Sequence, residues 1–502
     1  MDKSIIVIGA GIAGLSAGCY GQMNGYRTQI FELHDKPGGV CTAWKRKGYT
    51  FDGCIHWLGG SAPGNIVHTI WEELGAVQGR RMINHEVFKQ IVIGDRSLRI
   101  YTNLDRFEQA LKGVSPRDGQ VIEELVREVR RFSTFSPPWD KPGLGLADVL
   151  RMLPYAHSLF KYQKISTEEF AARFRDPFLR QVFLAIFPLP DMPMFLAILN
   201  LAIICCGNAG YPEGGSLEFA RAIERRYLGL GGQIHYNSRV SEILVENGCA
   251  VGVRLADGGE HRADWVISAA DGHSTLFEML PGKYVGTTVR RYYEELPLWK
   301  PLVYICLGVN RDLSQEPPIV MVHLEPPVTI ADEKYEWISW FNYGYDSTLA
   351  PAGKSVVISM QETNFEFWEE VYADRSRYEV EKQKVTQTLV AELEKYYPGI
   401  RSQIEVTDVA TPMTWVRYTG NWRGAYQGWL PTRKAFGTRM KKALPGLDNF
   451  CMCGQWVEPG GGVPTAAASG RQVIQVICKR DKKRFVTTVE KLRRQIEDSR
   501  YM

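Results

Sequence analysis

The hydrophobic pattern begins with a short apolar run near the N-terminus, at residues 5–8, and a second predicted strand follows at residues 28–31. A glycine-rich turn follows the first run, and small or apolar residues fill much of the interval before the second. Short apolar runs bounded by turn residues are typical of strands that a parallel sheet buries on both faces. The pattern therefore predicts a β–α–β unit and an α/β fold.

Two distant stretches continue this unit. Residues 211–272 read as a turn, a helix, a strand, a hairpin and a final apolar strand at 265–268. Residues 449–453 form another apolar run, followed by a glycine-rich loop and by Pro464, which suits the first turn of a helix. The sequence thus predicts a discontinuous nucleotide-binding domain built from three segments, at 1–85, 209–284 and 431–502.

The intervening segments, 86–208 and 285–430, are predicted to form a second, α+β domain that binds substrate. The first contains an amphipathic helix, EELVREVRRF, and an apolar stretch without charged residues at 192–212. We interpret that stretch as a buried helix, with shallow membrane insertion as the alternative. The second contains three runs rich in β-branched and aromatic residues, which predict strands: PLVYICLGVN, YEWISWFNYGY and KSVVISMQET.

Composition narrows the function classes. The 502 residues include 45% hydrophobic and 23% charged residues, with a net charge of +4 that argues against nucleic-acid binding. Ten cysteines without a CxxC motif or metal-ligand spacing predict reduced thiols in a cytoplasmic protein and no metal site. The basic run at 479–494 predicts either a solvated helix face or peripheral contact with an anionic membrane.

The first turn carries the chemistry of a dinucleotide site. Gly9, Gly11 and Gly14 form GxGxxG between the strand and the helix. In this motif the first glycine makes the tight turn, the second lets a pyrophosphate approach, and the third lets helix and strand pack closely. Glu32 follows the second strand at the spacing of an acid that binds a ribose hydroxyl.

A family resemblance rests on motifs from both ends and the middle of the chain: Gly9-x-Gly11-x-x-Gly14, Glu32, Gly38–Gly39, GYTFDGCIHW, YPEGGSLEFARAI and EPGGGVPTAAASGR. With them the chain resembles the phytoene desaturase, carotenoid isomerase and retinol saturase group of FAD-dependent oxidoreductases, in the amine-oxidase-like flavoprotein superfamily. The resemblance is weak over residues 104–207. It implies a monoamine-oxidase-like two-domain fold with a Rossmann-type domain, non-covalent FAD, and desaturation or saturation of a carbon–carbon bond in a long apolar substrate.

The resemblance also implies where FAD binds. Val240 stands where this fold offers a backbone amide to adenine, and Ala269 lies in a loop near the pyrophosphate. The helix that begins at Gly462 would present its N-terminus to the flavin, where its partial positive charge stabilises a reduced ring. The expected cofactor-binding residues are Gly9, Gly11, Ile12, Ala13, Gly14, Glu32, Leu33, Gly38, Gly39, Val40, Val240, Ala269, Gly454, Gly462, Val463 and Pro464.

The segment YTFDGCIHWLGG is expected to arrive beside the flavin. Relatives of the desaturase type have a Thr- and Pro-containing turn here, whereas this chain has His56 and Trp57. His56 is a candidate acid or base, and a structural histidine is the equal alternative. Asp52 is interpreted as structural and Cys54 as a small buried hydrophobe.

An aromatic-rich stretch at 411–431 supplies the other candidates of the reaction site. Its aromatic residues either anchor a loop or line the substrate, and the resemblance favours lining for Tyr418 and Tyr426. With no second complete GxGxxG unit, the electron partner is expected to be oxygen, a quinone or another carrier. Three alternatives stay open: a flavin-assisted cis–trans polyene isomerase, an amine oxidase, and a prenyl- or lipid-binding escort protein without a flavin.

Overall fold

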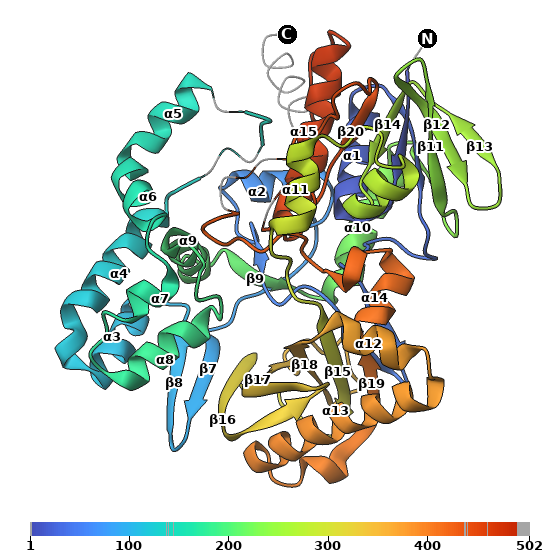
Figure 1. Ribbon diagram of the computed structural model, residues 1–502. Helices are drawn as coiled ribbons and strands as arrows, with labels where there is room; N and C mark the ends of the chain where they lie inside the picture. Colours follow the sequence, from blue (N-terminus) through green and yellow to red (C-terminus); the bar gives the residue numbers. More distant parts are fainter. Residues whose placement is uncertain are drawn as a thin grey trace.

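A computed structural model describes residues 3–488, apart from 137, 139, 144, 436, 437, 439 and 459. Figure 1 shows three groups of elements. A parallel sheet with its helices lies at the top of the view, a helical group lies on the left, and a second large sheet lies at the bottom. Among the residues described, no helix has both the length and the apolar character needed to cross a bilayer.

The upper sheet has five parallel strands in the order β10-β2-β1-β14-β20. Its strands are β1 (Ser4–Ile8), β2 (Arg27–Phe31), β10 (Gln233–His235), β14 (Trp265–Ser268) and β20 (Phe450–Met452). All three sequence segments of the predicted nucleotide-binding domain contribute strands to it. The sheet confirms the predicted α/β fold.

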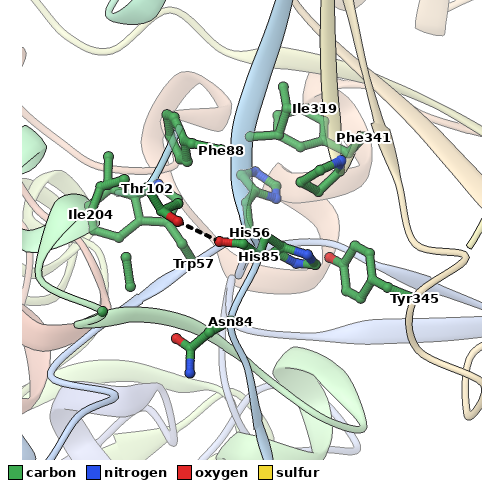
Figure 2. Close-up of a pocket in the computed structure, with 13 residues that line it drawn as sticks. His56, Trp57, Asn84, His85, Phe88, Thr102, Ile204, Ile319, Phe341 and Tyr345 are labelled. Carbon is green, nitrogen blue, oxygen red and sulfur yellow. Dashed lines mark hydrogen bonds between the residues drawn. The ribbon is translucent and has the colours of Figure 1, made fainter. Parts of the chain in front are cut away.

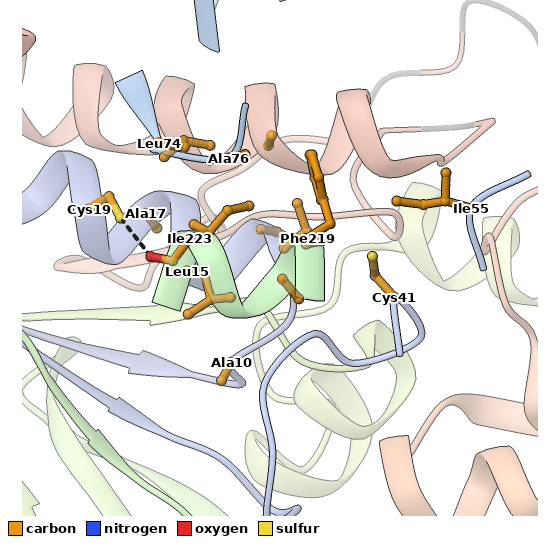
Figure 3. Close-up of a cluster of buried hydrophobic side chains, with 14 of the residues drawn as sticks. Ala10, Leu15, Ala17, Cys19, Cys41, Ile55, Leu74, Ala76, Phe219 and Ile223 are labelled. Carbon is orange, nitrogen blue, oxygen red and sulfur yellow. Dashed lines mark hydrogen bonds between the residues drawn. The ribbon is translucent and has the colours of Figure 1, made fainter. Parts of the chain in front are cut away.

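Three helices pack on this sheet: α1 (Ile12–Met23), α10 (Gly215–Gly229) and α15 (Val463–Arg480). The small residues of α15 permit an unusually close approach to α1. A Cβ atom on Gly470 would lie 2.3 Å from the carbonyl oxygen of Ala13, and the Ser16 hydroxyl donates to the carbonyl of Ala467 at 2.7 Å. Figure 3 shows side chains from α1 and α10, including Leu15 and Ile223, in the core on this side of the sheet.

Smaller sheets connect the upper group to the rest. An antiparallel sheet, β11-β12-β13, flanks the parallel sheet. A hairpin, β3-β4, and a three-stranded sheet, β5-β9-β6, follow the double glycine and join distant segments of the chain. These strands are β3 (Ala43–Arg46), β4 (Tyr49–Asp52), β5 (Leu58–Gly59), β6 (Met82–Ile83), β9 (Ala209–Pro212), β11 (Val240–Glu246), β12 (Cys249–Leu255) and β13 (Glu260–Arg262).

The lower sheet has seven strands in the order β19-β15-β18-β17-β16-β7-β8. All eight residues of β15 are buried, because alternate side chains pack beneath α12 and α13 or face the upper group. The elements are β7 (Val87–Ile93), β8 (Arg96–Tyr101), β15 (Leu302–Val309), β16 (Ile319–Ile330), β17 (Glu333–Asn342), β18 (Ser355–Glu362), β19 (Ile404–Ala410), α12 (Phe365–Tyr372) and α13 (Arg375–Tyr396).

The helical group encloses a separate core. Its helices are α3 (Leu104–Val114), α4 (Gly119–Phe132), α5 (Leu146–Met152), α6 (Ala156–Tyr162), α7 (Thr167–Ala171), α8 (Pro177–Ile186) and α9 (Met194–Cys205). None of the α9 residues is exposed, because the helix packs against α4, α6 and α7. The apolar stretch at 192–212 is therefore a buried helix in its central part, as the first of its two interpretations predicted.

The remaining helices connect these groups. They are α2 (Ile66–Glu73), α11 (Thr287–Glu295), α14 (Pro412–Thr419), the 3₁₀ turns η1 (Pro116–Asp118), η2 (Leu153–Tyr155), η4 (Ile400–Gln403) and η5 (Trp422–Gly424), and the π-helix η3 (Ser274–Met279). Tyr293 of α11 contacts the rings of Trp429 and Trp456, and this aromatic cluster belongs to the core beneath the parallel sheet. Parts of 285–430 thus pack with the upper group rather than with the lower sheet.

The described part of the basic run at 479–494 is only partly helical, whereas one interpretation predicted a helix face. Helix α15 ends at Arg480, and residues 483–487 adopt no regular secondary structure. The part from 489 onward, with the C-terminal end of the segment 431–502, lies outside the described residues.

Candidate active site

A single cavity of about 1620 Å³ extends from the GxGxxG turn to the helical group. Residues of the upper sheet, the lower sheet and the helical group all contribute to its wall. Pockets for one small molecule usually measure roughly 300–1,000 Å³. The cavity therefore has room for a dinucleotide and a second, elongated ligand.

The GxGxxG turn forms one end of this cavity. Gly9 has a φ of 95°, which favours glycine, and its amide donates to the Phe31 carbonyl at 2.8 Å. Gly11 precedes α1 in an extended conformation, and a Cβ atom built on it would meet nothing within 4 Å. A Cβ atom on Gly14 would lie 1.9 Å from the Gly9 carbonyl oxygen. Gly11 thus faces open space, whereas Gly14 serves packing and does not line the cavity.

Glu32 lies at the end of β2 and is almost fully buried. Its carboxylate accepts hydrogen bonds from the amides of Ala10 at 2.6 Å and His34 at 2.8 Å. Burial raises the pKa of Glu32, and the amides oppose that shift. A carboxylate offers about four acceptor positions, so Glu32 retains capacity for a ligand hydroxyl. It lines the cavity together with Leu33.

The double glycine lies directly against the turn. Gly38 and Gly39 have φ values of 109° and 59°, and the Gly38 amide donates to the Ala10 carbonyl at 2.9 Å. A Cβ atom on Gly38 would lie 2.2 Å from the Cys41 carbonyl oxygen, so this position requires glycine. Both glycines and the adjacent Val40 line the cavity.

The N-terminus of α15 forms the opposite wall. Gly462 precedes the helix with a φ of 94°, and no side chain caps the first turn. Free amides and a partial positive charge at such a terminus favour a negatively charged group. Gly462, Val463 and Pro464 line the cavity, as do Gly454 and Ala269 at the ends of β20 and β14.

Two more of the residues that we expected in the site do not line the cavity. Val240 begins β11 as a buried side chain and does not line the cavity. Tyr418 is 42% exposed on the last turn of α14, where its ring contacts His34 at 4.8 Å between centroids. The orientation of α14 turns Tyr418 outward, so the expectation that it lines the substrate differs from the structure. Tyr426 does line the cavity and contacts Trp299.

His56 and Trp57 lie where the cavity meets a smaller pocket of about 70 Å³, whose lining residues are drawn in Figure 2. The His56 ring stacks on Phe341 at 3.9 Å, and its Nδ1 lies 3.1 Å from the Tyr343 hydroxyl. Burial lowers the pKa of His56 to about 3, with a further contribution from the Lys89 cation. The imidazole is therefore neutral at pH 7.

The sequence interpretation missed Lys89, a buried lysine in β7 that lines the same cavity. Its Nζ donates to the carbonyls of Ala185 and Ile186, each at 2.9 Å, at the C-terminus of α8. Burial lowers its pKa to about 8. A single lysine inside the apolar run VFKQIVI was the available signal, because such a strand leaves its side chain no route to solvent.

Asp52 organises the segment that carries His56. Its fully buried carboxylate accepts hydrogen bonds from the Ser216 hydroxyl, from the Ser216 amide at 2.8 Å, from the Tyr211 hydroxyl at 2.9 Å and from the Cys54 amide at 3.0 Å. Asp52 does not line the cavity, which agrees with the structural role expected of it.

The thiols of Cys41 and Cys54 lie beside each other, close to Asp52. The Cys41 thiol is buried, and its pKa is raised first by its contact with Cys54 and then by burial. No group of three or more His, Cys, Asp or Glu that could hold a metal ion occurs in the described part of the chain.

Most of the remaining cavity wall is apolar. Side chains from α8, α9 and the lower sheet contribute to it, among them Phe195, Leu199, Met321, Phe341 and Met360. Polar exceptions include Lys89, Asn200 and Glu362. Water would be largely displaced by an elongated apolar ligand in this half.

Comparison with known proteins places these features in a family. The model of the family described as flavin containing amine oxidoreductase matches residues 12–478. Prolycopene isomerase of Arabidopsis thaliana is 27% identical over 500 residues, covering 93% of this chain and 81% of the relative. The 4,4'-diapophytoene desaturase of Methylomonas sp. is 25% identical, covering 96% of both chains. All-trans-retinol 13,14-reductase of Homo sapiens is 24% identical, covering 84% of this chain and 77% of the relative.

Among solved structures, an oxidoreductase from Methanosarcina mazei matches with a TM-score of 0.61 and 20% identity, covering 94% of this chain and 100% of the other. At this identity the likeness concerns the fold alone.

Proposed function

Because the chain belongs to the family of flavin-containing amine oxidoreductases, we propose that it is an FAD-dependent oxidoreductase acting on a carbon–carbon bond of a long apolar substrate. The substrate class is an isoprenoid, a carotenoid or another lipid, and the reaction is desaturation or saturation. The observation that carries this proposal is the single cavity, with a glycine-lined end beside α1 and an apolar end beside α9. The three relatives are named for polyene substrates, which supports the same class.

The residues at the glycine-lined end fit FAD. Gly11 leaves open space where a pyrophosphate needs close backbone approach, and the N-termini of α1 and α15 both offer free amides. Glu32 keeps acceptor capacity for a ribose hydroxyl. FAD, when bound there, supplies a two-electron acceptor or donor. The binding is non-covalent in this proposal, since the cavity-lining Cys41 thiol is held protonated by its raised pKa.

Residues of the apolar end bind and orient the substrate and exclude water. A proton-transferring group works best with a pKa near the operating pH. Lys89 meets that condition, because its pKa is about 8 and two of its three N–H donors account for its bonds to carbonyls. We assign proton transfer to Lys89, whose ammonium donates a proton in saturation and whose neutral amine accepts one in desaturation. The neutral His56 ring then holds this part of the cavity wall in place through its contacts with Tyr343 and Phe341.

Replacement of Lys89 and His56 tests this assignment. We expect Lys89→Met to lower kcat by about 100-fold or more, the usual contribution of a proton-transferring side chain. His56→Asn should lower kcat by less than about tenfold at pH 7, because a neutral imidazole with a pKa of about 3 is a weak base and has no imidazolium proton to donate. Both variants should retain their flavin absorbance, and the pH dependence of kcat near pH 8 should disappear only in Lys89→Met. The reverse ranking, with flavin retained in both, would assign the role to His56.

The function itself is tested by reducing the purified holoprotein anaerobically with light and offering it a panel of isoprenoids and unsaturated lipids. Reoxidation of the flavin by a long polyene, with a product that gains two hydrogen atoms, supports saturation. Desaturation is tested by offering saturated analogues to the oxidised holoprotein. Reduction of the flavin, with a product that loses two hydrogen atoms, supports that direction. Reaction with primary amines alone would indicate an amine oxidase, and a colourless protein that gains no flavin on reconstitution would indicate an escort protein.

A second candidate function is cis–trans isomerisation of a polyene, which the similarity to prolycopene isomerase favours. Isomerisation leaves the product mass unchanged, so mass spectrometry separates it from desaturation and saturation. For desaturation the proposed electron acceptor is oxygen, a quinone or another carrier. Saturation requires a reduced carrier as the electron donor, and isomerisation transfers no net electrons.

A further inference from the structure

The outer side of α5, η2 and α6 carries an unusual concentration of exposed apolar side chains. Of the nine large hydrophobic residues exposed in the described part of the chain, five lie between residues 146 and 160. They are Leu146, Val149, Leu150, Leu153 and Phe160, which we call the docking face. Leu146 is 79% exposed and Phe160 is 60% exposed.

The spacing of these residues places them on one side of the segment. Residues 146, 149, 150 and 153 follow the i, i+3, i+4, i+7 pattern of a single helix face. In Figure 1, α5 and α6 lie at the edge of the molecule, away from the two sheets. An apolar stripe that would normally meet a core here faces outward.

The opposite side of the same segment borders the cavity. Met152 and Leu159 line it, as does Gln163 just after α6. The loop that precedes α5 also contributes, through Lys141 and Pro142. One layer of helix therefore separates the docking face from the apolar end of the cavity.

Within the segment 145–164 the exposed charged side chains are all basic. Between residues 145 and 164 the sole acidic residue is Asp148, which is buried and paired with Lys141 at 3.0 Å. Arg151 is exposed on α5, and the exposed Lys164 ammonium lies 3.8 Å from the centre of the Phe160 ring. An apolar face whose own segment carries exposed cations and no exposed acid suits the interface of a bilayer that contains anionic lipids.

We propose that the docking face inserts into the surface of an anionic lipid bilayer, and that apolar substrate enters the cavity from the bilayer past Met152 and Leu159. The entry route rests on the proposed function, whereas insertion of the face rests on its own exposure and charge. The inserted segment lies in the interface and does not cross the bilayer, in keeping with its short helices. This location differs from the two that the sequence suggested, at 192–212 and 479–494.

Vesicle flotation with the full-length holoprotein tests insertion. We expect binding to vesicles of phosphatidylcholine with phosphatidylglycerol, and at least tenfold weaker binding of the Leu150→Ser/Leu153→Ser variant. Arg151→Gln/Lys164→Gln should weaken binding to the anionic vesicles and leave any binding to pure phosphatidylcholine unchanged. Leu228→Ser and Val380→Ser, which change exposed apolar residues on other helices, are matched controls that should bind like the wild type.

Transfer of cis-parinaric acid, a fluorescent polyene fatty acid, tests the entry route. The Leu150→Ser/Leu153→Ser variant should take up the probe from detergent like the wild type but at least tenfold more slowly from anionic vesicles. Loss of uptake from both sources would overturn the entry route. A holoprotein that binds vesicles yet acts on no lipid would refute the proposed function and leave insertion standing.

Wild-type protein that does not float with anionic vesicles would overturn insertion, as would a serine variant that floats equally well. The wild type could instead fail to bind vesicles and form a dimer that the serine substitutions convert to a monomer, as measured by light scattering. That result would show that a second copy of the chain covers the docking face.

Discussion

The Gly11→Val variant is expected to fold like the wild type but to purify without flavin. Its backbone is extended, with a φ of −66°, so valine adds no strain there. The new side chain would enter open space at the head of α1, where the pyrophosphate of FAD must approach the backbone. We expect flavin affinity to fall by about 100-fold or more, equivalent to about 2.7 kcal/mol. Visible absorbance per protein and the melting temperature of the apoprotein are the two measurements.

Two other glycines serve as controls for this result. Gly14→Ala should destabilise the protein itself, because the added methyl group would overlap the Gly9 carbonyl. Gly113→Ala changes an exposed glycine of α3 with open space around it, and should alter neither flavin content nor folding. A Gly11→Val protein that retains stoichiometric flavin would show that the cofactor does not lie against this turn.

The Asp52→Ala variant is expected to lose about 3 kcal/mol of unfolding free energy, as is typical when a buried charged partner is removed. The carboxylate satisfies two hydroxyl groups and two amides inside the protein, and alanine would leave these donors without an acceptor. The same bonds hold the segment of His56 against residues 211–216. Urea unfolding monitored by tryptophan fluorescence measures the loss.

Asp257→Ala is the matched control for this variant. Asp257 also accepts a hydrogen bond from the amide two residues later, at 2.9 Å, but it lies in an exposed turn. Its replacement should change the unfolding free energy by no more than about 0.5 kcal/mol. Equal effects of the two substitutions would mean that the contacts of Asp52 with Ser216 and Tyr211 contribute little.

The glycine-lined end of the cavity was predictable because its determinants are local. Gly9, Gly11 and Glu32 stand at fixed distances within one β–α–β unit, and the φ of 95° at Gly9 favours glycine. The strands at 265–268 and 449–453 were recognisable for a similar reason, since a parallel sheet buried on both faces selects short apolar runs. Their pairing with β1 follows from the fold that the resemblance implied.

The substrate end was less predictable because it depends on how helices face each other. Tyr418 and Tyr426 lie in the same aromatic stretch, yet Tyr418 is exposed on the last turn of α14, and only Tyr426, in the loop after η5, lines the cavity. Lys89 is recognisable as a site residue only from the packing of α8 against β7, which places the last carbonyls of α8 beside its ammonium. The aromatic cluster around Tyr293 joins α11 to the upper group through contacts with residues far along the chain, which no local pattern reveals.

The strand order of the parallel sheet has a consequence for biosynthesis. Strand β20 pairs with β14, and the N-terminus of α15 follows it directly, so the last wall of the flavin site comes from residues 450–464. A ribosome must therefore synthesise the helical group and the whole lower sheet before that wall exists. Nascent chains that stop short of β20 carry the GxGxxG turn without its opposite wall. The complete flavin site is consequently available only after residue 464 has been synthesised, and flavin supply matters from that point of translation onward.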